Sequence, residues 1–163
     1  MKQLKSLALV ILLFSFCISC SSNEDMENLD SDSGTENTNV SSYEQEILDL
    51  INAHRTSNGL SRLALLDAIK TQTNAHTDYM INAGAISHDN FNQRSAYLRE
   101  NADARSTAEN VASGYSTAQA VVNGWLNSQG HRQNIEGNYT HFHLTAKQSG
   151  NNRWYYTNIF IRQ

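Results

Sequence analysis

Apolar residues recur at helical spacing over one short stretch of the chain. Between positions 118 and 127 they occupy the i, i+3, i+4, i+7 and i+8 positions, as Ala118, Val121, Val122, Trp125 and Leu126. This spacing places the five side chains on one face of an amphipathic helix. Ser116 or Thr117 can cap the helix, and Gly130 is expected to end it.

Three further helices are predicted upstream, over residues 43–57, 67–83 and 92–100. Asp67 is expected to cap the second helix, and Gly59 and Gly84 follow the first and second helices as stop signals. The inward stripe of the first helix is Ile47, Leu50, Ile51 and His54. The buried candidates of the second helix are Ala68, Ile69, Ala75, Tyr79 and Met80.

The C-terminal part has the pattern of a β-hairpin. Residues 140–147 alternate polar and apolar, residues 149–152 form a turn signal, and residues 153–162 are rich in aromatic and β-branched types. Helices followed by a terminal antiparallel hairpin favour an α+β domain built in layers.

The N-terminus resembles a bacterial lipoprotein signal. Lys2 and Lys5 precede an apolar run, residues 7–18, that is too short to remain as a membrane-spanning helix. The run ends at Cys17-Ile-Ser-Cys20, so residues 1–19 are predicted to be removed and Cys20 to be lipidated. The alternative is an ordinary secretion signal cut nearby. Lipidation would anchor the protein to a membrane of a Gram-negative-type cell envelope, with exposure on the cell surface as one outcome.

Residues 20–42 are predicted to be a disordered tether because they hold few apolar residues. This segment carries six acidic residues and no basic one. The chain has 12 basic and 16 acidic residues. Without Lys2, Lys5 and the six acids of the tether, residues 43–163 balance at 10 of each. A near-neutral domain argues against nucleic acid as a partner.

Both cysteines, Cys17 and Cys20, lie in the signal region. The domain therefore has no disulfide, although export would permit one. At about 120 residues it is long enough to be stabilised by its own core.

The six histidines differ in their settings. His54 and His76 lie on predicted inward helix faces, where a packed, hydrogen-bonded histidine is the usual role. His141 and His143 share one face of a strand and form either a polar sheet face or a pair of metal ligands. His88 and His131 are expected in loops at element boundaries, where sites tend to be built.

Several motifs in sequence order resemble the CAP superfamily in its short bacterial, SCP-like form. The superfamily comprises cysteine-rich secretory, antigen 5 and pathogenesis-related proteins. The clearest motifs are Glu-Asn-Val-Ala-x-Gly at 109–114 and Val-Val-x-x-Trp-x-x-Ser-x-Gly-His-Arg-x-Asn-Ile at 121–135. Leu50-Ile-Asn-Ala-His-Arg55, Ser87-His88 and Trp154–Phe160 agree as well. The resemblance covers residues 43–163 and implies a three-layer α-β-α sandwich around a small central antiparallel sheet.

The resemblance also implies a cleft in which two histidines and two acids can hold a divalent metal, often zinc. By motif, His88, His131 and Glu109 match three of these residues, and Glu109 and His131 would be the catalytic candidates. The second acid is missing, because no Asp or Glu occurs between Asn110 and Ile135.

Two histidines and one carboxylate still suffice for zinc with an open water position. Glu136 is a possible substitute for the missing acid but is expected to be a surface residue. In the alternative role, the same residues only tie loops together. Further motif residues are expected to be architectural: Asn110, Trp125, Arg132 and Asn134.

Two functions remain open from the sequence. The first is a ligand-binding module on a lipid anchor, presenting the cleft around His88, Glu109 and His131 to an apolar or glycan ligand. The second is a metal-assisted hydrolase acting on peptide or cell-wall material, with Glu109 as base. The missing acid, and the lack of nucleophile and HExxH motifs, favour binding over catalysis.

Overall fold

The computed structural model describes residues 40–163. The predicted signal peptide, the lipidation site Cys20 and most of the predicted tether lie outside these residues. Ser41 caps the first helix, which begins at Ser42, one residue before the predicted start. Helix α1 runs over Ser42–Ser57, α2 over Asp67–Ala83, α3 over Phe91–Asn101, α4 over Ala118–Leu126 and α5 over Gln129–Ile135.

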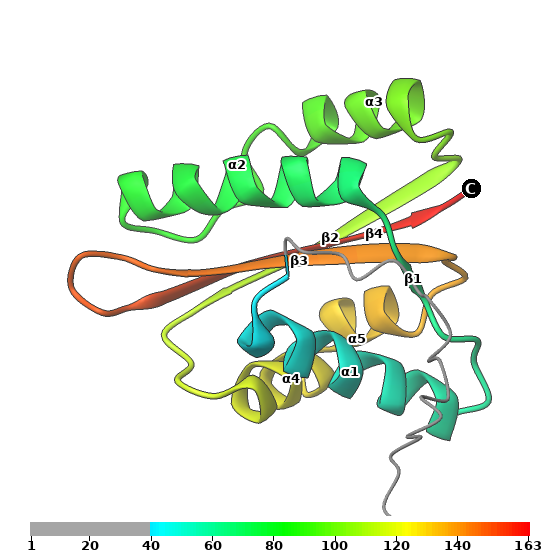
Figure 1. Cartoon of the computed structure of the whole chain (residues 1–163), viewed down its shortest axis with the longest axis horizontal. Coiled ribbons are helices and arrows are strands. Elements are labelled where there is room, and N and C mark those ends of the chain that lie inside the picture. Colours follow the sequence, from blue (N-terminus) through cyan, green and yellow to red (C-terminus); the bar gives the residue numbers. More distant parts are fainter. Residues whose placement is uncertain (1–39) are drawn as a thin grey trace, which may run out of the picture. The chain divides into compact units, whose positions relative to one another are not determined.

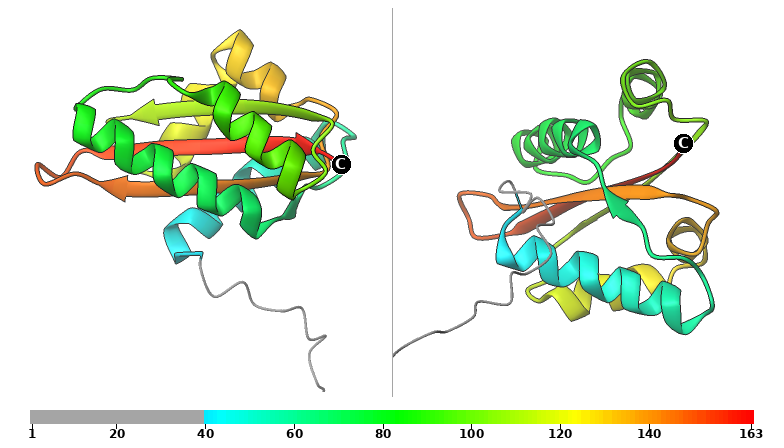
Figure 2. Two further views of the ribbon diagram at one scale, coloured as in Figure 1. Left: turned by 90° about the horizontal axis from the view of Figure 1, so that it is seen from above. Right: turned by 45° about the vertical axis from the view of Figure 1, so that its right-hand side comes forward.

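Four strands form one sheet in the order β1-β3-β4-β2. They are β1 (Ala64–Leu65), β2 (Ser106–Ser113), β3 (His141–Gln148) and β4 (Trp154–Arg162). The pairs β2–β4 and β3–β4 are antiparallel, and the two-residue β1 adds a parallel pairing with β3. Helices α2 and α3 cover one face of the sheet, and α1, α4 and α5 cover the other (Figures 1 and 2). The predicted three-layer α-β-α sandwich and its C-terminal hairpin are confirmed.

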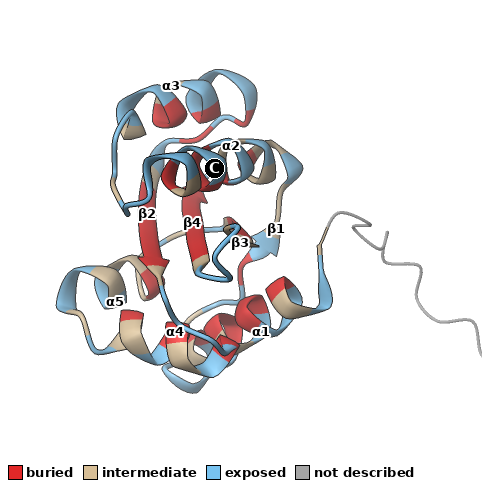
Figure 3. Ribbon diagram, turned by 90° about the vertical axis from the view of Figure 1, so that its left-hand side faces the viewer, coloured by how far each residue is buried: buried red, intermediate tan, exposed pale blue. Residues whose placement is uncertain are grey.

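The main hydrophobic core fills the layer between the sheet and helices α1, α4 and α5. Figure 3 shows buried residues along the strands and on the helix faces turned toward them. The predicted stripe of α4 contributes its four buried residues, and Leu126 packs partly buried at the margin. The largest fully buried side chains of this core are Trp125, Tyr156, Phe142 and Phe160.

Two local predictions are wrong, and one strand was not predicted. Gly130 does not end α4: the helix stops at Leu126, and Gly130 lies inside the short helix α5. Asp67 is the first residue of α2 instead of its cap, where its charge still favours the positive end of the helix dipole. The motif around Glu109 forms strand β2, which the sequence pattern did not predict because two polar residues interrupt its alternation.

The buried face of α2 differs in part from the predicted one. Ile69, His76 and Met80 are buried as expected, but Ala75 and Tyr79 are exposed and Thr73 and Thr77 are buried instead. The two hydroxyls are paired with the sheet: Thr73 with Thr145 and Thr77 with Thr157, each at an oxygen separation of 2.8 Å. Such pairing allows polar side chains to occupy a buried face.

Beyond its short pairing with β1, the outer edge of β3 is covered by an ion pair. Lys70 Nζ donates to Glu44 Oε1 at 2.7 Å and to the Leu144 carbonyl at 3.0 Å. The Ala146 backbone N–H donates to the same Glu44 oxygen at 2.9 Å. Unpaired backbone groups at a sheet edge invite strand association, so the Glu44–Lys70 pair protects this edge.

Glu44 is therefore a stabilising residue that joins α1, α2 and β3. Burial alone would raise its pKa, but hydrogen bonds from Lys70 and from the Ser41 and Ala146 backbones outweigh burial and hold the pKa below its ordinary value. A carboxyl whose pKa is lower in the folded state than in the unfolded state adds to the free energy of unfolding at every pH above the unfolded-state pKa. This contribution is lost as the pH falls from there through the folded-state pKa.

We predict that Glu44→Gln lowers the free energy of unfolding by about 1–3 kcal/mol at pH 7, because a charged hydrogen-bond acceptor is lost from a buried position. Urea unfolding of the variant and the parent measures the difference. The difference should shrink as the pH falls below 4.5, the ordinary pKa of this carboxyl. The matched control is Glu46→Gln, which changes an exposed carboxylate on the same helix. Equal losses in the two variants would contradict the role given to Glu44.

Candidate functional site

The candidate site forms where the α2–α3 loop meets strand β2. His88 lies in this loop, and Glu109 lies in the middle of β2. His88 Nδ1 and Glu109 Oε1 are 2.9 Å apart. The Glu109 side chain is 1% exposed and the His88 side chain 54% exposed. A buried carboxylate thus orients an imidazole that faces solvent.

Arg94 neutralises Glu109. From α3, Arg94 Nε donates to Glu109 Oε2 and Arg94 Nη2 to Oε1, both at 2.8 Å. The third guanidinium nitrogen donates to the Asp89 carbonyl at 2.7 Å, and the guanidinium carbon lies 5.8 Å from the centre of the Phe91 ring. A buried carboxylate needs such a partner, since an unpaired charge in the interior is strongly unfavourable.

Arg94 was not predicted as a site residue, although its spacing indicates that it is buried. It lies three residues after Phe91 and four before the buried Leu98, which places a charged residue on the inward face of a helix. A buried arginine needs acceptors for its N–H groups, which can be backbone carbonyls, as for Arg55, or a carboxylate. Which of these Arg94 meets depends on how α3 packs on the sheet.

His76 completes the buried part of the site. Its Nε2 donates to the Ser87 carbonyl at 2.8 Å and lies 3.9 Å from Glu109 Oε1. Burial lowers the pKa of His76 despite the nearby carboxylate, so the ring is neutral at pH 7. Its outer face stacks on Tyr79 at 5.8 Å between ring centres. The Tyr79 hydroxyl donates to the Asp89 carboxylate at 2.8 Å, which raises the pKa of Tyr79.

His131 lies in α5, not in the predicted loop, and the connection between it and Glu109 is indirect. The Asn110 side chain donates to the His131 carbonyl at 3.1 Å. Asn134 donates to Asn110 Oδ1 at 2.8 Å and to the Glu109 carbonyl at 3.2 Å. Burial lowers the pKa of His131, and the neighbouring His88 lowers it further. The motif residues of β2 and α5 thus tie these elements together through backbone and amide groups.

Other residues from the sequence analysis lie outside this cluster. Glu136 accepts from His54 at 2.9 Å, an interaction between α1 and the end of α5. His143 is fully buried, and its Nδ1 accepts the Leu144 backbone N–H at 2.9 Å. Trp125 donates from its indole to the Val111 carbonyl at 3.2 Å, and Arg132 is exposed.

Comparison with known proteins identifies the family. The profile of CAP, the Cysteine-rich secretory protein family, matches residues 48–160. The chain belongs to the CAP family. Two proteins of Bacillus subtilis are similar in sequence: the uncharacterized protein YkwD (32% identical over 117 residues) and the uncharacterized membrane protein YlbC (33% over 124 residues). The matches cover 69% and 74% of this chain but 46% and 34% of those proteins, so the CAP chain spans less than half their length.

Solved structures agree with this assignment. An extracellular SCP-domain protein from Bacillus anthracis superposes with a TM-score of 0.64 at 28% identity, over 74% of this chain and 40% of that one. An outer surface protein from Borrelia burgdorferi has a TM-score of 0.66 at 20% identity, over 73% and 91% of the two chains. At that identity the second match shows the fold alone. The family match and these structures together make the chain a domain with the CAP fold, and the Bacillus anthracis relative is described as an extracellular protein.

The cluster of side chains around Glu109 in this CAP domain does not fit a metal ion bound through that carboxylate. Both carboxylate oxygens accept from Arg94, and Oε1 also contacts His88. Within residues 40–163, no three His, Cys, Asp or Glu side chains are arranged to hold a metal ion. Metal binding by His88, His131 and Glu109 stays a prediction, and the contacts around Glu109 give it no support.

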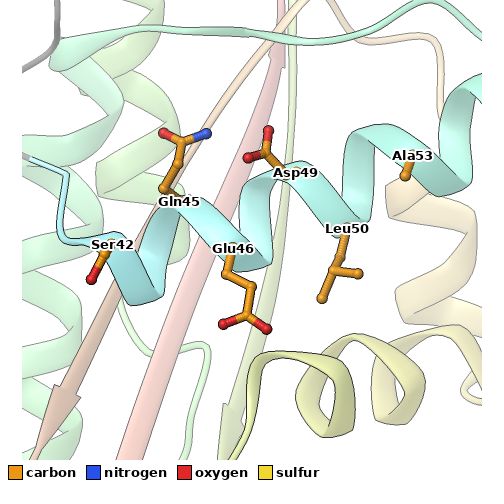
Figure 4. Close-up of a pocket in the computed structure, with 6 residues that line it drawn as sticks. All are labelled: Ser42, Gln45, Glu46, Asp49, Leu50 and Ala53. Carbon is orange, nitrogen blue, oxygen red and sulfur yellow. The ribbon is translucent and has the colours of Figure 1, made fainter.

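A separate groove lies along the outer side of α1 (Figure 4). It has a volume of about 520 Å³ and is lined by Ser42, Gln45, Glu46, Asp49, Leu50 and Ala53. Leu50 is half-buried and packs against the main core, so its side chain supplies apolar surface inside the groove. Glu46 and Asp49 give the groove an acidic rim. Among the described helices of the domain, none is long and apolar enough to cross a membrane.

Proposed function

We propose that this CAP domain is a non-enzymatic binding module of the cell envelope that recognises a glycan through the surface around His88. The observation that carries the proposal is the His88–Glu109 contact. A half-exposed imidazole held by a buried carboxylate is a preorganised hydrogen-bonding group directed at solvent. Preorganisation lowers the entropic cost of binding a ligand.

The groups next to His88 suit a sugar. Tyr79 is 41% exposed, and its ring position is set by stacking on His76 and by its hydrogen bond to Asp89. An aromatic face offers an apolar surface for a sugar ring, while Asp89 and His88 offer hydrogen bonds to its hydroxyl groups. The balanced charge of the domain gives no basis for nucleic-acid binding.

A catalytic role for Glu109 receives less support. A general base must reach the proton that it abstracts, and its pKa must suit the operating pH. Glu109 is buried and held by a guanidinium on both oxygens. We therefore favour the binding module over the metal-assisted hydrolase.

We predict that the protein binds N-acetylglucosamine oligomers of cell-wall type and that His88→Ala weakens the binding about tenfold or more, the effect of one lost hydrogen bond of about 1.4 kcal/mol. Calorimetric titration measures the affinity. His141→Ala, which removes another partly exposed histidine outside the cluster, is the control and should bind like the parent. Unchanged affinity in His88→Ala would contradict the proposal, as would an absence of binding by the parent.

The groove on α1 favours a second candidate function, the binding of an apolar ligand such as an acyl chain. Its volume is within the range of small-molecule sites, and Leu50 and Ala53 supply apolar lining. At the rim Asp49 is paired with Arg62 at 3.6 Å, which leaves Glu46 as a negative charge that opposes an anionic headgroup, so a neutral amphiphile is the better match.

For the groove, we predict that Leu50→Gln reduces the affinity for a fluorescent neutral acyl probe by about tenfold, because burying the amide disfavours the bound state. Fluorescence titration measures the affinity. Ile86→Gln is the matched control, since Ile86 is an exposed apolar residue of another segment. Equal affinities of the two variants would show that the probe does not use the groove.

Attachment of the module to the membrane through a lipid on Cys20 is part of the same proposal. The support is the sequence around Cys17-Ile-Ser-Cys20, together with a relative named as an uncharacterized membrane protein. Several acyl chains on one cysteine would anchor the chain firmly, whereas a single chain binds membranes only reversibly.

We predict that Cys20→Ala abolishes metabolic labelling of the protein by an alkyne-tagged fatty acid and moves the protein from the membrane fraction to the soluble fraction. Cys17→Ala is the control and should be labelled like the parent. Labelling that persists in Cys20→Ala would rule out Cys20 as the anchor.

A further inference from the structure

We propose that Arg94 takes the place of a divalent metal beside Glu109, so that a guanidinium serves as the permanent counter-ion of this carboxylate. This inference goes beyond the proposed function, because it concerns how the site around Glu109 is held together and not which ligand binds there.

The first step of the argument is the saturation of the carboxylate. Glu109 is buried, and its two oxygens accept from Arg94 Nε and Nη2 at 2.8 Å. Arg94 Nη2 lies 2.7 Å from the second oxygen as well, so it bridges the two. Oε1 additionally contacts His88 Nδ1 at 2.9 Å. A metal ion could reach these oxygens only by displacing the guanidinium.

The second step is that the guanidinium is not free to leave. Arg94 is 8% exposed at its side chain, and its remaining nitrogen donates to the Asp89 carbonyl at 2.7 Å. Its flat face lies beside Phe91, at 5.8 Å from the ring centre. Planar, bidentate pairing of this kind is specific to arginine and costs little side-chain entropy for each hydrogen bond.

The third step concerns the donors that surround the carboxylate. His88 Nδ1 lies 2.9 Å from Glu109 Oε1. His76 Nε2 lies 3.9 Å from the same oxygen, but it donates to the Ser87 carbonyl and would have to give up that proton and that hydrogen bond to bind a metal. Two histidines and a carboxylate are the types of ligand that zinc prefers. The positive charge of Arg94 repels a dication from this position, which removes the affinity that the donors would otherwise have. Arg94 is thus the residue that makes the site independent of metal.

The experiment compares zinc binding by the purified full chain and by Arg94→Met, which keeps the length of the side chain but removes its charge. Calorimetric titration after chelator treatment should show that Arg94→Met binds one zinc ion per chain. Its affinity for zinc should exceed that of the parent by about 100-fold or more. Adding His88→Ala to this variant should abolish the gain. Zinc should also raise the melting temperature of Arg94→Met but not that of the parent.

Arg94→Lys is the matched control, because it retains the charge without the bidentate fork and should stay as weak a zinc binder as the parent. Arg94→Gln is carried in parallel, since its amide can still donate to Glu109 if the methionine variant fails to fold. Equal zinc affinities of the parent and the uncharged variants would overturn the proposal, whether all of them bind or none does. So would tight zinc binding by the parent that requires His88 and Glu109. The readout uses no glycan, so failure of the proposed function leaves this result unaffected.

Discussion

The burial of one carboxylate shapes the part of the domain where α2, α3 and β2 meet. Glu109 points from the edge strand into the layer covered by these two helices, where a charge without a partner would destabilise the fold. Arg94 supplies the partner and thereby fixes how α3 packs, since that helix contributes only one large apolar residue, Leu98, to its fully buried face. The same carboxylate orients His88 and sets the conformation of the loop that presents it. Packing and recognition therefore depend on one ion pair.

The two faces of the sheet are stabilised differently. Toward α1, α4 and α5 the contacts are mainly those of a conventional apolar core with aromatic residues. Toward α2 they combine small apolar clusters with paired hydroxyls and a neutral histidine. A hydrogen-bonded layer of this kind gains less free energy of folding from the burial of apolar surface than an apolar core does. It specifies the position of the packed helix more closely, because each polar group must meet its partner. The candidate site lies on this second, polar face.

Sequence patterns predicted the long elements well and the polar ones poorly. The helices over residues 43–57 and 92–100 and the terminal hairpin follow from regular apolar spacing, and the structure confirms them to within two residues. Strand β2 escaped prediction because Glu109 and Asn110 are buried polar residues, and a local pattern cannot anticipate that distant groups will satisfy them. Gly130 was misread for a similar reason, since a second helix resumes after Ser128 and includes it. Within the site, His88 and Glu109 were identifiable from motifs, whereas their contact and the role of Arg94 arise only from tertiary packing.

Neither edge of the sheet is left as an open row of backbone groups. On the β3 side Glu44 and Lys70 bind the exposed carbonyl and N–H, and on the β2 side Asn134 and Trp125 donate to the carbonyls of Glu109 and Val111. All four caps are side chains from helices, so they persist only while the helices stay docked. A partly opened molecule would uncover the edge whose helices had moved away, and that edge would become prone to pair with a neighbouring molecule. Whether copies of this domain stay separate therefore depends on the docking of α1, α2, α4 and α5, the helices that carry these side chains.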